Sequence, residues 1–77
     1  MPPNRDELDA ALLAAHARRD RAALIGLYQQ AGDMAEAGGY ATAAGFYLTH
    51  AYVFALEAGD PRAGDLYARL KAAGLEE

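Results

Sequence analysis

Most of the apolar residues of this chain are alanine or leucine. Twenty alanines and ten leucines occur among 77 residues, whereas Ile25 and Val53 are the only β-branched apolar residues. Alanine and leucine have high helix propensities, and strands favour β-branched and aromatic residues. The composition therefore predicts an all-α fold.

Three start signals for helices are spread along the chain. Asn4 with Glu7 three residues later resembles a capping box. Asp20 is a suitable N-cap for a second helix. Asp60 followed by Pro61 combines a capping side chain with a proline at the first helical position, where its missing N–H does no harm.

Glycines supply the stop signals. Gly38 and Gly39 end the second helix, Gly59 ends the third, and Gly74 followed by Leu75 predicts a Schellman ending for the fourth. The loops are too short for anything but antiparallel neighbours. The sequence predicts one domain, 1–77, of helical hairpins with helices over roughly 5–18, 20–37, 40–58 and 61–73.

Most of the third helix carries no charge, since residues 37–56 are all uncharged, and apolar side chains occur on every face. Twenty such residues are enough to cross a bilayer. The flanking Glu36 and Glu57 are acidic, however, where membrane spans carry basic anchors. We therefore expect no membrane contact but a central helix, covered on one side by its own chain. Apolar surface left on its other side would be a hint of function.

The charge balance argues against nucleic acid as a partner, because the net charge is −4. Arg18, Arg19 and Arg21 form the one basic cluster, which we interpret as a solvated turn, with phosphate or nucleic-acid contact as the alternative. No secretory signal precedes the first helix, so we expect a cytoplasmic protein. Cysteine is absent, which excludes disulfides and thiolate zinc sites within the chain.

The chain shows no grouping of residues typical of catalysis. His16 and His50 lie far apart in the sequence, with no metal-ligand spacing around either. A single histidine such as His50 in an apolar helix is more often a hydrogen-bonded core or interface residue than a catalyst. We therefore expect no enzyme activity, no metal and no cofactor.

Helices two and four share a local pattern, because Leu27 and Tyr28 in one correspond to Leu66 and Tyr67 in the other. Their offset leaves room for one intervening helix, as in helical-hairpin repeats. The expected apolar stripe of helix two is Leu24, Leu27, Tyr28, Ala31 and Ala35.

Over about residues 20–75 the chain resembles the tetratricopeptide repeat. Tyr28 takes the aromatic place of the repeat, Ala31 and Gly32 take the Leu-Gly pair, and Gly39 takes the turn glycine. The small–large–small places of the second helix are taken by Ala44, Leu48 and Ala51. Ala35 departs from the pattern, which has a large residue there, and the long second helix before Pro61 is similar to the longer repeats of some bacterial regulators.

The resemblance implies a protein-binding module whose first helices line a concave groove. The residues placed there are Gln29, Asp33, Glu36 and Asp65. Such an acidic lining favours a basic segment of a protein partner. The alternative is that these residues are only the solvated faces of helices two and four.

Self-association is the first contact that we expect, because one and a half repeats bury little core on their own. The candidates for a homodimer seam are Phe46, Tyr47, Tyr52 and Phe54, of which we expect about half to be intrachain core. The alternative is a compact four-helix structural domain, or one that binds a small apolar ligand in a cavity beside helix three.

Overall fold

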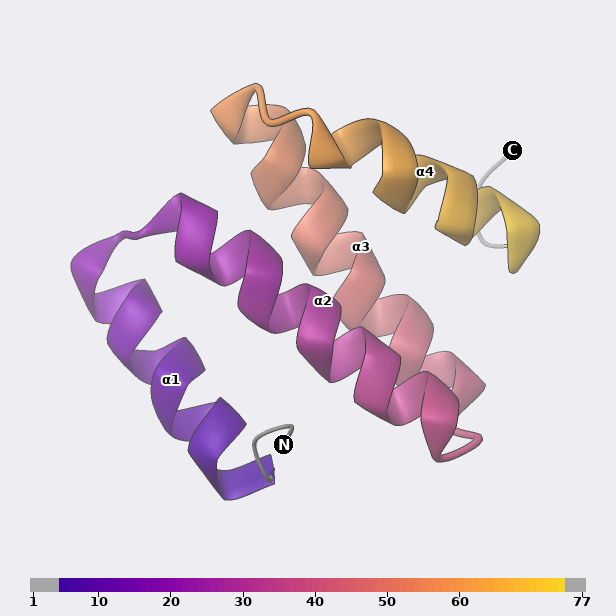
Figure 1. Ribbon diagram of the computed structural model, residues 1–77, viewed down its shortest axis with the longest axis horizontal. Helices are drawn as coiled ribbons and strands as arrows, with labels where there is room; N and C mark the ends of the chain where they lie inside the picture. Colours follow the sequence, from indigo (N-terminus) through magenta and orange to yellow (C-terminus); the bar gives the residue numbers. More distant parts are fainter. Residues whose placement is uncertain (1–4, 75–77) are drawn as a thin grey trace.

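The computed structural model describes residues 5–74, which form four α-helices joined by short turns. These are α1 (Arg5–Arg18), α2 (Arg21–Ala37), α3 (Ala41–Ala58) and α4 (Arg62–Ala72) (Figure 1). The predicted all-α fold class is confirmed, and every helix end lies within one residue of its predicted position. Asn4 and Leu75, which carry two of the predicted end signals, lie outside the described residues.

Consecutive helices pack against each other in the described part of the chain. α1 packs on α2, α2 packs on α3, and α3 packs on α4. In Figure 1, α3 lies behind α2, and α4 leads away from the C-terminal end of α3. The molecule is a flattened body of 32 × 30 × 18 Å.

Two aspartates lie at helix starts as predicted, although α4 begins at Arg62 with Pro61 as its N-cap, one residue later than expected. Asp20 is the N-cap of α2, and its side chain accepts a hydrogen bond of 3.1 Å from the backbone N–H of Ala23. Asp60 accepts one of 2.9 Å from the backbone N–H of Arg62, at the start of α4. These bonds satisfy amide groups that the first turn of a helix leaves without a partner.

Left-handed glycines end the helices. Gly39, Gly59 and Gly74 have φ of 80°, 65° and 79°, a conformation that a Cβ atom disfavours. The turn between α1 and α2 is different, because Arg19 adopts φ of 54° there without being glycine. The predicted turn thus lies at Arg19 and Asp20, between the ends of the two helices, and the left-handed residue within it has no sequence signal.

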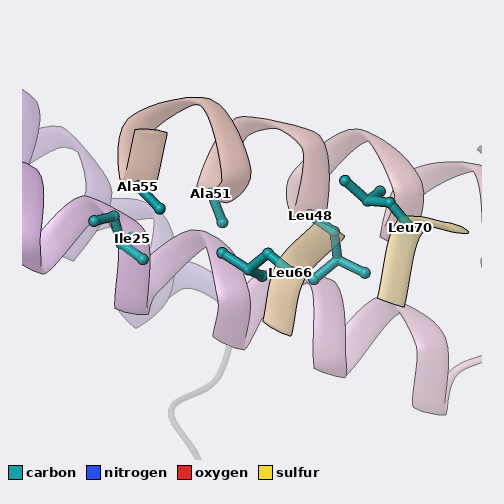
Figure 2. Packing of buried hydrophobic residues seen from close by; sticks show 6 residues of the cluster. All are labelled: Ile25, Leu48, Ala51, Ala55, Leu66 and Leu70. Carbon is teal, nitrogen blue, oxygen red and sulfur yellow. The ribbon is translucent and has the colours of Figure 1, made fainter. Parts of the chain in front are cut away.

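The main core lies where α2, α3 and α4 meet (Figure 2). It joins one side chain of α2 with three of α3 and two of α4, namely Ile25, Leu48, Ala51, Ala55, Leu66 and Leu70. Ala51 and Ala55 of α3 are fully buried, and their small size lets the neighbouring helices approach.

α2 and α3 lie close together at Gly32. A Cβ atom at this position would lie 2.8 Å from both Cγ and Cδ2 of Leu48. Close helix contact thus occurs at this helix-interior glycine. It does not occur at Gly64, where a Cβ atom would have no neighbour within 4 Å.

Candidate interaction surfaces

The predicted acidic partner site is divided between two helices. Gln29, Asp33 and Glu36 follow one another at helical spacing along one face of α2, and Asp65 lies on α4. Gln29 is half-buried, whereas the three carboxylates are exposed. Exposure of this kind fits both a binding surface and a solvated face.

Arg69 of α4 reaches across to the acidic face of α2. Its Nη2 atom lies 2.8 Å from Oδ1 of Asp33 and 3.3 Å from Oε2 of Glu36. Partial burial acts to lower the pKa of the guanidinium, but the bonds and charges of the two carboxylates outweigh it and raise the pKa. Arg69 therefore stays charged and neutralises part of the acidic site.

We term Gln29, Asp33, Glu36, Asp65 and Arg69 the α2–α4 surface. Sequence reasoning missed Arg69, because a residue 33 positions from Glu36 carries no local signal of the pairing. The helical spacing of Asp65 and Arg69 did indicate that the two share a face of α4. With three carboxylates and one guanidinium, the surface keeps an excess of negative charge.

A second arginine joins α4 to α2 at the other end. The Nη2 atom of Arg62 donates to a carboxylate oxygen of Asp60 at 2.9 Å and to the carbonyl of Ala22 at 3.4 Å. The side-chain hydrogen bond from Arg62, followed by the backbone one, lowers the pKa of Asp60 to about 2. This end of α4 thus contacts α2 through the hydrogen bond from Arg62 to Ala22. The guanidinium of Arg62 is held in place by Asp60, which stays ionised at neutral pH.

Two arginines of the basic cluster between α1 and α2 lie close to carboxylates. Arg18 lies 3.5 Å from Asp20, and Arg21 lies 3.8 Å from Glu57 at the end of α3. Both contacts join exposed side chains, which contribute little to stability. Two of the three arginines thus face carboxylates, which favours the solvated-turn interpretation over phosphate binding.

The predicted self-association residues lie on different sides of α3. Phe46 is 59% exposed, and Tyr47 is half-buried. Tyr52 packs beside Tyr67 of α4, with ring centroids 5.8 Å apart, and Phe54 packs against the main core on the side of α2. The structure therefore does not bring the four together as one seam, and two of them are largely intrachain packing.

Tyr28 is the centre of an aromatic cluster between α1, α2 and α3. Its ring stacks on His50 and Phe54, with centroids 5.1 and 5.8 Å away. Its hydroxyl is hydrogen-bonded at 2.9 Å to Nε2 of His16 on α1. Burial, and to a lesser extent the charge of ionised Tyr47, raises the pKa of Tyr28. This contact of α1 with the rest of the cluster had no sequence signal.

His50 is hydrogen-bonded, as an interface or core histidine is expected to be. Its Nδ1 atom lies 2.9 Å from the carbonyl oxygen of Phe46. Because a carbonyl can only accept, Nδ1 carries the proton. The ring also packs against Phe46, with centroids 4.4 Å apart, and so holds that exposed ring in place.

An exposed stripe runs along the outer side of α3. Its apolar members, Phe46, Val53 and Leu56, are 59%, 44% and 56% exposed. Thr49 is exposed between Phe46 and Val53, and Thr42 is exposed one turn before Phe46. The five positions follow one another in alternating steps of four and three residues. We term Thr42, Phe46, Thr49, Val53 and Leu56 the α3 seam.

Two clefts flank the helices. One of about 360 Å³ lies between α1, α2 and the start of α3, and its apolar lining includes Leu8, Leu12, Met34 and Tyr47. Arg5 and Asp9 add charge to this lining. The other, of about 370 Å³, is lined by residues of α2, α3 and α4 that include Glu36 and Arg69.

No family model matches the chain, and no curated protein or solved structure matches it. The resemblance to tetratricopeptide repeats therefore depends on the residues named above. Among residues 5–74, no helix is both long and apolar enough to span a membrane. The same residues contain no group of three or more histidine, cysteine or acidic side chains that could hold a metal ion.

Proposed function

We propose that this protein is a tetratricopeptide-like helical-hairpin module that acts by binding protein, first of all a second copy of itself, without catalysis. The observation that carries the proposal is the α3 seam. Its three apolar side chains are about half exposed and lie along one helix face with no charge between them. Contiguous apolar surface of this kind is typical of interaction sites.

The packing of α2 on α3 supports the tetratricopeptide-like part of the proposal. Gly32, in the glycine place of the repeat, lies against Leu48, in the large place of the second helix. Ala44 and Ala51, in the two small places, are both buried. The residues that carry the resemblance are thus also those through which the two helices approach each other.

The free energy that burial of the seam can contribute is comparable with the cost of association. Fully burying a Val, Leu or Phe side chain contributes about 1.5–3 kcal/mol, so six half-exposed side chains from two copies contribute roughly 5–9 kcal/mol. Association itself costs about 4–15 kcal/mol. We therefore expect a reversible dimer that forms at high protein concentration and dissociates on dilution.

Light scattering over a wide dilution range tests this proposal. We expect the mass to rise from one chain towards two, and Val53→Lys to abolish the rise, because it places a charge in the middle of the seam. Ala68→Lys is the matched control, since Ala68 is exposed on α4. A constant monomeric mass for the unmodified chain, or equal association of both variants, would overturn the proposal.

The α2–α4 surface is the second binding site that we propose, for a basic segment of a different protein. Its excess of carboxylates supports this choice, although Arg69 already holds two of them. A lysine-rich peptide should bind less tightly to Asp65→Asn and more tightly to Arg69→Gln. Opposite or absent effects in a calorimetric titration would contradict a site at this surface.

The cleft between α1, α2 and α3 favours one alternative function, the binding of a small apolar ligand. Its volume of about 360 Å³ lies at the lower end of the range for ligand pockets. Arg5 is placed to meet an acidic group on such a ligand. If this is the function, decanoate should shift the amide NMR signals of Ala31 and Ala35, and Leu12→Asp should abolish the shifts.

A further inference from the structure

The α3 seam has the spacing of a helix that packs along another helix. Steps of four and three residues keep side chains on one side of a helix over two heptads. Helices that meet through such stripes cross at about 20°. A second copy offers a stripe of the same period, equally free of charge, and so matches the seam in spacing and in polarity.

Charges beside the seam favour an antiparallel direction. The N-terminal turn of α3 has no acidic residue, and its N-cap, Tyr40, makes no side-chain hydrogen bond to the helix. The partial positive charge of that end is therefore not compensated. The opposite end carries the partial negative charge of the C-terminal carbonyl groups and Glu57, which lies 3.8 Å from Arg21 of its own chain. An antiparallel arrangement places unlike helix ends side by side, whereas a parallel one places like ends together.

The sizes of the side chains set the register. Phe46 and Leu56 are the large members of the seam, Thr49 and Val53 are the smaller ones between them, and Thr42 lies one turn before Phe46. Antiparallel pairing aligns Phe46 of each copy with Leu56 of the other. It also aligns Thr49 with Val53.

Thr49 is compatible with burial in such a contact. Its Oγ1 atom already donates to the carbonyl oxygen of Gly45 at 2.8 Å. The hydroxyl donor therefore needs no partner from the second copy, and its burial leaves no unsatisfied hydrogen.

We propose, on the basis of the self-association proposed above, that two copies pair through antiparallel α3 seams, with Phe46 of each against Leu56 of the other. In this register residues 44–58 of the two helices overlap, a strip roughly 22 Å long and about 10 Å wide, or roughly 220 Å². This area is well below the roughly 800 Å² per partner of a standard interface. The pairing is therefore reversible.

Cross-linking tests direction and register, because the chain has no cysteine of its own. Helix axes 8–10 Å apart bring facing Cα atoms to about 4–5.5 Å, which a disulfide can join. Chains with Phe46→Cys and chains with Leu56→Cys are mixed and oxidised mildly, and each product is identified by mass. Ala68→Cys gives the background of random collisions.

The mixture should yield the mixed disulfide at least about tenfold above the Ala68→Cys background, and each variant alone should stay near that background. In the proposed register two copies of Phe46 are separated by ten residues, or about 15 Å along the helices, too far for a disulfide. A second mixture, Thr49→Cys with Val53→Cys, keeps both large anchors and should cross-link as well.

Two results would overturn this inference while leaving self-association intact. One is efficient homodisulfide formation by Phe46→Cys alone, which indicates parallel helices. The other is a dimeric mass in light scattering with no seam disulfide above background in either mixture, which indicates another face. A monomeric mass at every concentration would overturn the inference and the self-association together.

Discussion

Adding one methyl group at Gly32 should destabilise the protein, although alanine is the better helix former. The new Cβ atom would lie 2.8 Å from Cγ and Cδ2 of Leu48, and Leu48 is only 3% exposed and held in the core. Overpacking of this kind costs about 1–3 kcal/mol. The higher helix propensity of alanine offsets about 1 kcal/mol of this cost. Gly32→Ala should therefore lower the free energy of unfolding by about 0–2 kcal/mol.

Gly64→Ala is the matched control, because the same chemical change there meets open space. It should raise the free energy of unfolding by up to about 1 kcal/mol. The two variants should thus differ by about 1–3 kcal/mol, and each kcal/mol corresponds to roughly 4–8 °C in Tm for a domain of this size. Urea and thermal unfolding followed by circular dichroism, at a concentration where the chain is monomeric, measures the difference. Equal stability of the two variants would refute the close approach of α2 and α3.

Three further predictions concern the core and the two arginine contacts of α4. Leu66→Ala removes a fully buried side chain and should lower the free energy of unfolding by about 2–5 kcal/mol in urea titrations. Arg69→Ala should lower it by about 0–1 kcal/mol at low salt and by less at high salt, because the ion pairs it removes are partly exposed. Asp60 has a folded-state pKa of about 2, below its usual value of 3.8. Its contribution to stability is therefore complete above pH 3.8 and is lost as the pH falls towards 2. NMR titration of the carboxyl group should give that midpoint, and Asp60→Asn should flatten the corresponding part of the stability profile; a midpoint near 3.8 would contradict the contact with Arg62.

The helix ends could be predicted because local chemistry determines them. Asp20 caps α2 with its own side chain, and Gly39 and Gly59 adopt the left-handed conformation that ends a helix. Each of these signals lies within a few residues of the boundary that it sets. These signals therefore act independently of how the rest of the chain packs.

The packing faces of α2 were predicted only in part. The expected stripe contains Leu24 and Ala31, which are buried, but not Ile25 or Gly32, which are buried as well. The reason is that α2 packs against α1 on one side and α3 on another, so two stripes are covered. A single apolar stripe describes a helix with one neighbour, and the number of neighbours is a tertiary property.

The candidate surfaces show the same division between local and distant information. The separation of Tyr52 from Phe54 follows from the helix itself, since two residues apart means about 200° around the axis. The expectation that about half of the aromatic candidates are intrachain core agrees with this local rule. The contact of Arg69 with Asp33 and Glu36 is different, because it depends on how α4 lies across α2.

The sequential packing of the helices has a consequence for how the chain folds and opens. Within residues 5–74, backbone contact between helices occurs only between consecutive ones, so the structure is close to a linear array. Chains with mostly local contacts fold within microseconds to milliseconds. In such arrays the end units open without disrupting the middle. Amide hydrogens of α1, which packs chiefly on α2, should thus exchange with solvent well before those of α2 and α3, and the α2–α3 hairpin should be the last part to lose protection.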